Sequence, residues 1–126
     1  MEGSVENTMA YFVATLQKAR DVAHMWHWKV KSFAQHMALG ELYETLQDLT
    51  DELVEMYMGK YGTEFHIPLS EPNPFSEQSP LEFVQQLDSY LGSIKSAIPQ
   101  DGWLINKFEE LQGEVHRVKY KLENLH

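Results

Sequence analysis

The sequence predicts an all-α protein that folds as a four-helix bundle, in which a long proline-containing loop joins two helical hairpins. Apolar residues recur at spacings of three and four in four separate stretches, which is the period of one helix face. Residues 63–78 contain Pro68, Pro72 and Pro74 and therefore cannot continue a helix. A chain of 126 residues suits one domain with one core, spanning residues 1–126.

The first hairpin is expected to consist of helices at about residues 5–31 and 36–60, with a tight connection over residues 31–35. The two apolar stripes are Val5, Met9, Phe12, Leu16, Ala19, Ala23 and Val30, then Leu42, Leu46, Leu49, Leu53 and Met56. Gly40 lies inside the second helix, where glycine costs about 1 kcal/mol relative to alanine. A close helix contact would explain this glycine.

The second hairpin is expected at about residues 80–98 and 102–125. The run Ser79-Pro80-Leu81-Glu82 combines a hydroxyl N-cap, a proline at the first helical position and a glutamate able to close a capping box. Pro99 ends the third helix, and Asp101 can cap the fourth. Residues 63–78 would reach roughly 50 Å when extended, which is enough to cross the bundle. An up-down-up-down bundle with a bulging loop is the alternative.

Composition excludes several classes of function. The formal net charge is -9, which repels phosphate backbones, so DNA binding is not expected. With no cysteine in the chain, a bound metal must use His, Asp and Glu. The N-terminus lacks the pattern of a signal peptide and no apolar run has membrane-spanning length, so a cytoplasmic protein without a membrane partner is expected.

Five residues have the spacing of a metal site. Asp51 follows His36 by fifteen residues and Glu55 follows Asp51 by four, so the two carboxylates lie on one face of the expected helix. His24 and His27 form an i, i+3 pair on the preceding helix. Imidazole together with carboxylate suits iron, manganese or zinc.

The acidic residues of the second helix point away from its apolar stripe. At 100° per residue, Glu44, Asp48, Asp51 and Glu55 centre nearly opposite the leucines. This direction is wrong for a metal site inside one bundle of the ferritin type, which uses two Glu-x-x-His motifs, whereas the chain has a single one, from Glu123 to His126. It is the direction expected for a site across a dimer interface, and equally for a solvated acidic face.

The segment from His27-Trp28-Lys29 through His36, Asp51 and Glu55 resembles the Dps branch of the ferritin-like superfamily, whose pattern is His-Trp-Asn, a second His, and Asp-x-x-x-Glu. The resemblance covers about residues 20–62 and includes small, divergent phage-type members. It implies a ferritin-like crossover bundle with a di-iron ferroxidase site shared across a two-fold interface, two histidines coming from one subunit and two acids from its neighbour.

The resemblance assigns His36, Asp51 and Glu55 as ligands, together with His27 or His24. The family usually separates its two histidines by twelve residues, which is the distance from His24 to His36, whereas His27 lies nine residues before His36. Lys29 stands where the family has Asn. The family's lysine-rich DNA-binding tail is absent.

Two hypotheses follow. In the first, a homo-oligomer, at least a dimer, binds iron at His24, His27, His36, Asp51 and Glu55 and oxidises Fe(II) to Fe(III), with oxygen or peroxide accepting the electrons; Mn(II) and Zn(II) are further candidates. In the second, a metal-free helical oligomer acts by binding a partner, for example as a phage protein that targets a host factor or a small molecule.

Overall fold

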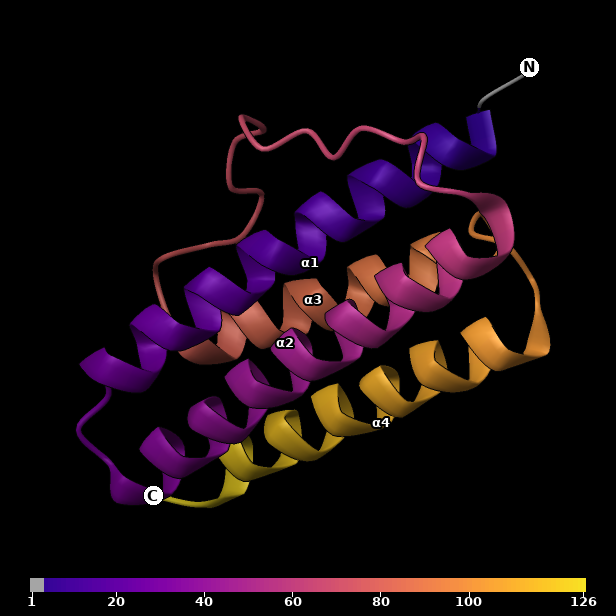
Figure 1. The fold of residues 1–126 in the computed structure, drawn as a ribbon. Helices are drawn as coiled ribbons and strands as arrows, with labels where there is room; N and C mark the ends of the chain where they lie inside the picture. Colours follow the sequence, from indigo (N-terminus) through magenta and orange to yellow (C-terminus); the bar gives the residue numbers. More distant parts are fainter. Residues whose placement is uncertain (1–3) are drawn as a thin grey trace.

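The computed structural model describes residues 4–126, with side chains described from residue 7 onward. It contains the helices α1 (Ser4–Lys29), α2 (Phe33–Tyr61), α3 (Pro80–Ile94) and α4 (Gly102–Asn124), and no strand within these described residues. The helices pack against one another in the bundle drawn in Figure 1. The prediction of an all-α four-helix bundle is confirmed.

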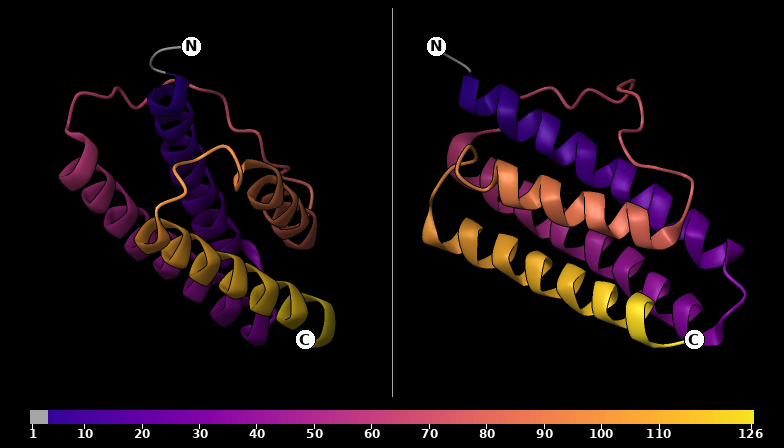
Figure 2. Two further views of the ribbon diagram at one scale, coloured as in Figure 1. Left: turned by 90° about the vertical axis from the view of Figure 1, so that its right-hand side faces the viewer. Right: turned by 180° about the vertical axis from the view of Figure 1, so that it is seen from behind.

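Helices that follow one another in the sequence are not always neighbours in the bundle, because α2 and α3 lie at diagonally opposite corners. α1 packs on α2, α2 on α4, α4 on α3 and α3 on α1. Figures 1 and 2 show the loop after α2 returning along the outer side of α1 to the opposite end of the bundle, where α3 begins. α3 therefore runs in the same direction as α2, and the structure has the crossover connection rather than the up-down-up-down alternative.

The connection between the first two helices is shorter than predicted. α1 ends at Lys29 rather than residue 31, and α2 begins at Phe33 rather than residue 36. Ser32 is the N-cap, because its hydroxyl accepts a hydrogen bond from the Gln35 amide at 3.3 Å. Ser32 lies within the connection predicted over residues 31–35, and its cap starts α2 inside that segment.

The third helix ends earlier than predicted, at Ile94 rather than residue 98. Pro99 disfavours helical backbone at Ile98, the residue before it, so the helix unwinds in its last turn. The Gln100 side chain donates to the carbonyls of Lys95 and Ile98 at 2.8 and 2.7 Å, which satisfies acceptors that the helix leaves unpaired.

The predicted cap of α3 is confirmed, whereas that of α4 differs. Ser79 accepts a hydrogen bond from the Glu82 amide at 3.0 Å, and a proline occupies the first turn of α3. Asp101 is the N-cap residue of α4, but its side chain makes no capping hydrogen bond. Instead its carboxylate accepts from the Tyr61 hydroxyl at 2.7 Å and from Lys60 Nζ at 2.9 Å, so it joins the end of α2 to the start of α4.

All four helices contribute to one apolar core. The two predicted stripes of the first hairpin are buried over most of their length; the side chain of Val5 lies outside the described side chains. Phe12 of α1 lies at the centre, with ring centroids 5.6 Å from Phe108 and 6.4 Å from Tyr90. Each fully buried large side chain stabilises the fold by about 1.5–3 kcal/mol. No helix in the described part is long and apolar enough to cross a membrane.

Candidate functional site

The three histidines of the predicted metal site gather at the end of the bundle where α1 turns into α2. His24 and His27 lie in the last two turns of α1, and His36 lies in the first turn of α2. All three side chains are half-buried. The Ser32 cap brings them together, because it starts α2 directly after the turn.

His27 and His36 form a reciprocal pair. The Nδ1 atom of His27 lies 2.7 Å from the backbone oxygen of His36, and the Nδ1 atom of His36 lies 2.7 Å from the backbone oxygen of His27. The two rings stack, with centroids 3.8 Å apart and planes inclined by 19°. The contacts tie the end of α1 to the start of α2.

This geometry fixes the tautomer of both rings. A carbonyl oxygen only accepts hydrogen bonds, so each Nδ1 carries the hydrogen, and in the neutral ring Nε2 keeps its lone pair. Histidine ligands use this arrangement, with one ring nitrogen on a carbonyl and the other on the metal. Because the two ring planes are nearly parallel and a metal ion lies in the plane of its imidazole, His27 and His36 cannot share one ion unless a ring turns.

Gly40 explains the close approach of the two helices. A Cβ atom at this position would lie 2.9 Å from both Cε1 and Nδ1 of His27, which is closer than van der Waals contact allows. The expected close contact at this glycine is therefore observed. Its partner is the histidine ring.

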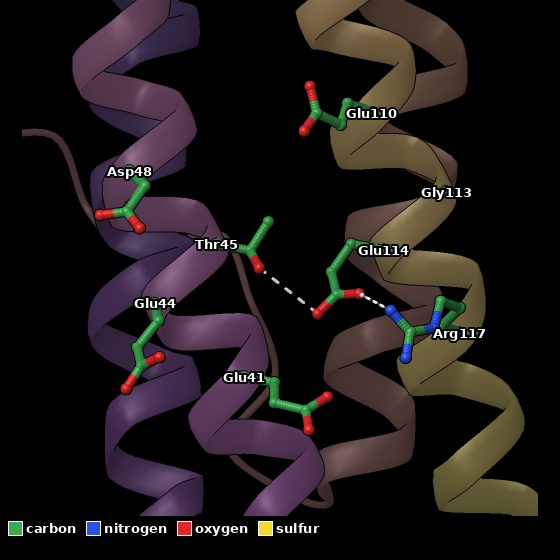
Figure 3. Close-up of a pocket in the computed structure, with 8 residues that line it drawn as sticks. All are labelled: Glu41, Glu44, Thr45, Asp48, Glu110, Gly113, Glu114 and Arg117. Atoms are coloured by element: carbon green, nitrogen blue, oxygen red, sulfur yellow. Dashed lines mark hydrogen bonds and ion pairs between the residues drawn. The ribbon is translucent and has the colours of Figure 1, made fainter.

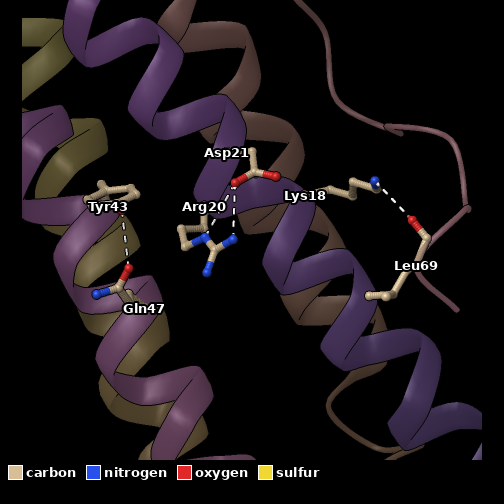
Figure 4. A network of polar contacts seen from close by, with 6 residues as sticks. All are labelled: Lys18, Arg20, Asp21, Tyr43, Gln47 and Leu69. Carbon is tan, nitrogen blue, oxygen red and sulfur yellow. Dashed lines mark hydrogen bonds and ion pairs between the residues drawn. The ribbon is translucent and has the colours of Figure 1, made fainter. Parts of the chain in front are cut away.

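His24 lies in an aromatic stack beside this pair. Its ring centroid is 4.0 Å from that of Tyr43, 4.1 Å from Trp28 and 6.2 Å from His27. The Tyr43 hydroxyl donates to Gln47 at 3.2 Å, as Figure 4 shows. Within the described part of the chain, neither nitrogen of His24 makes a hydrogen bond, so its tautomer is not fixed in this way.

Figure 4 also places the neighbouring charges of α1. Arg20 pairs with the adjacent Asp21 at 3.2 Å, and Lys18 reaches the Leu69 carbonyl of the crossover loop at 3.5 Å. Neither cation pairs with the acids of α2. The contact between Lys18 and Leu69 joins the crossover loop to the outer side of α1.

Asp51 and Glu55 are exposed on α2 and make no hydrogen bond or ion pair within the described part of the chain. The acids of α2 that face α4 behave differently. Glu41 pairs with Lys121 at 2.9 Å, and Glu52 pairs with Lys107 at 3.1 Å. Asp51 and Glu55 therefore point away from the core, as the helical projection indicated, and have no partner among the described residues.

One chain does not bring the five residues together. Fifteen residues of helix separate His36 from Asp51, which corresponds to about 22 Å along α2. Among the residues that the structure describes, no group of three or more His, Asp or Glu could hold a metal ion. A site that uses all of these side chains needs a second copy of the chain.

A second acidic surface was not foreseen from the sequence. Figure 3 shows a groove between α2 and α4, with a volume of about 660 Å³. The Glu114 carboxylate accepts from Thr45 at 3.4 Å and from Arg117 at 3.3 Å. Sequence spacing could not reveal the groove, because it does not say which face of α4 lies beside α2. The groove is lined by Glu41, Glu44, Thr45, Asp48, Glu110, Gly113, Glu114 and Arg117.

Large apolar side chains are exposed next to the histidines. Trp28 is 68% exposed, Phe33 76% and Met37 47%. A sequence signal accompanies them, since residues 22–40 contain no Asp or Glu. Exposed aromatic residues in one place are typical of an interaction surface.

A family model matches residues 27–122, which is more than half of the chain. The chain belongs to DUF5856, a family of unknown function. The DUF5856 match includes His27, His36, Asp51 and Glu55, and His24 lies before it. No curated protein and no solved structure matches the chain. The ferritin-like resemblance therefore stays a prediction.

Proposed function

We propose that this protein binds metal ions at an interface between two copies of the chain, and that it oxidises Fe(II) there. The observation that supports this most is the state of the histidine pair: His27 and His36 present Nε2 as the free nitrogen, and unpaired carboxylates lie on the same helix. Mn(II) and Zn(II) suit the same donors.

The residues have distinct roles in this proposal. The histidines of one copy supply neutral nitrogen donors, held in place by their carbonyl contacts. Asp51 and Glu55 of the other copy supply negative charge, which offsets the added positive charge as Fe(II) loses an electron. Oxygen or peroxide accepts the electrons. With their rings stacked and held in this way, His27 and His36 would each contact a separate ion.

The test is metal-dependent stability. Wild-type protein should unfold at a higher temperature when Mn(II), Zn(II) or oxygen-free Fe(II) is added, because a ligand that binds only the folded state stabilises it. At a free metal concentration of one hundred times Kd the gain is about 2.7 kcal/mol. The double variant Asp51→Asn with Glu55→Gln should lose this gain and Fe(II) oxidation while keeping its helicity.

A matched control removes two carboxylates elsewhere. Glu77→Gln with Glu123→Gln changes two exposed acids outside the site and should keep both the metal response and the oxidation. Without metal, the Asp51 and Glu55 variant should unfold no earlier than wild type, because crowded like charges are unfavourable until a cation offsets them. A wild-type midpoint indifferent to all three metals would overturn the proposal.

The second candidate function is a metal-free interaction module, which the exposed Trp28 and Phe33 favour. Metal analysis separates it from the first. Protein purified without chelator that carries no iron, manganese or zinc, and gains none when Fe(II) is added, acts by binding a partner instead.

A further inference from the structure

The outward face of α2 carries an exposed stripe whose spacing is symmetric. Its members are Phe33, Met37, Glu44, Asp51 and Glu55, all exposed, with successive spacings of 4, 7, 7 and 4 residues. At 100° per residue they fall within a sector about 40° wide. Glu44 is the centre of the stripe, with apolar residues on one side and acidic residues on the other.

Charge is distributed about the same centre. Residues 22–40 contain Lys29 and Lys31 and no acid, whereas residues 41–59 contain six acids and neither Lys nor Arg. Both lysines are exposed at the turn between α1 and α2. The acid-free segment 22–40 of one copy is therefore complementary in charge to the acidic segment 41–59 of another copy, whereas two acidic segments would repel each other.

We propose that this stripe pairs with the same stripe of a second copy, antiparallel and centred on Glu44. The inference rests on the proposed function, because it names the partner that completes the metal site. In this register Met37 of each copy lies opposite Asp51 of the other, and Phe33 lies opposite Glu55. A two-fold axis makes each contact twice, and it brings the turn of each copy, with Lys29 and Lys31, to the acidic end of the other copy's stripe.

The register also brings two of the predicted ligands, His36 of one copy and Asp51 of the other, close together. His36 comes level with position 52 of the second copy, one residue along the helix from Asp51. The separation of about 22 Å within one chain thus disappears between two chains. A parallel pairing would instead set acids against acids at Glu44, Asp51 and Glu55, where like charges repel.

The proposed two-fold axis passes at Glu44, so the Glu44 carboxylates of the two copies lie next to each other and repel. Glu44→Gln removes this repulsion and should lower the dimer dissociation constant roughly two- to fivefold at low salt. Glu77→Gln is the matched control, since it removes one negative charge at an exposed residue of the crossover loop, outside the stripe. It should leave the dissociation constant unchanged. Equal effects of the two variants would contradict the proposed centre.

Cross-linking tests the register directly, because the natural chain has no cysteine. Single-cysteine variants of the full chain are oxidised with diamide in the presence of a chelator. A disulfide needs Cα atoms about 4.4–6.8 Å apart, so only facing positions react. Glu44→Cys should form covalent dimers, Met37→Cys alone should not, and a mixture of Met37→Cys with Asp51→Cys should form the mixed dimer.

The outcomes separate this inference from the proposed function. Covalent dimers of Met37→Cys alone would indicate a parallel pair, and no covalent dimer of Glu44→Cys would reject pairing through this stripe; either result overturns the inference. Since no metal is present, neither result measures Fe(II) binding. If the expected cross-links form and wild type still ignores Fe(II), the pairing stands and the proposed function fails alone.

Discussion

Gly40→Ala should destabilise the protein, although the same change stabilises most exposed helices. Alanine in place of glycine favours a helix by about 1 kcal/mol. At position 40, however, the new methyl carbon would lie 2.9 Å from two atoms of the His27 ring, so that ring must move. The movement breaks two contacts of that ring, the 2.7 Å hydrogen bond from its Nδ1 to the His36 carbonyl and its stack on the His36 ring, whose centroid lies 3.8 Å away.

The magnitude follows from these two contacts. The lost hydrogen bond and the lost ring stack each cost roughly 0.5–1.5 kcal/mol, and the helix gain offsets part of the sum. We expect a net loss of about 1 kcal/mol, which lowers Tm by roughly 4 °C in a chain of this size. Thermal unfolding followed by circular dichroism measures it.

Gly113→Ala is the matched control. Gly113 lies inside α4, and a Cβ atom there meets nothing within 4 Å. This variant should therefore gain about 1 kcal/mol and unfold at a higher temperature.

A double-mutant cycle isolates the cause. In a His27→Ala background the ring is gone, so Gly40→Ala should become stabilising, as Gly113→Ala is. The reasoning is refuted if Gly40→Ala raises Tm in the wild-type background, or if removing the ring leaves its effect unchanged.

Three further expectations concern single features. Hydrogen bonds from Tyr61 and Lys60 lower the pKa of Asp101, so the stability that Asp101 contributes is present above about pH 4 and is lost as the pH falls through the lowered pKa. The difference in Tm between wild type and Asp101→Asn should therefore shrink in acid and stay constant near neutral pH. Ser79→Ala removes the cap of α3 and should cost about 0.5–2 kcal/mol in urea unfolding. With a net charge of -9, no submicromolar DNA binding is expected in gel shifts at moderate salt, and such binding would contradict the charge argument.

The sequence allowed the helices to be predicted because their signals are local. Apolar spacing identified the buried faces, and Ser79-Pro80 marked the start of α3 within one residue. The errors also have local causes. The cap at Ser32 starts α2 at Phe33 rather than residue 36, and Pro99 ends α3 at Ile94 rather than residue 98.

The candidate site divides in the same way. The helical period alone predicted that Asp51 and Glu55 point away from the core, and they are exposed. The pairing of His27 with His36 depends on two backbone carbonyls and on the space above Gly40. The spacing of the residues contains no information about either.

Four helices, their buried faces and the outward direction of the acids could be predicted from local patterns, because each depends on residues within a few turns of one another. The crossing of the loop, the contacts of Asp101 with Lys60 and Tyr61 in place of a cap on α4, and the stack of the histidine rings could be seen only in the folded protein. These features depend on which helices become neighbours, and that choice is made by packing the whole core at once.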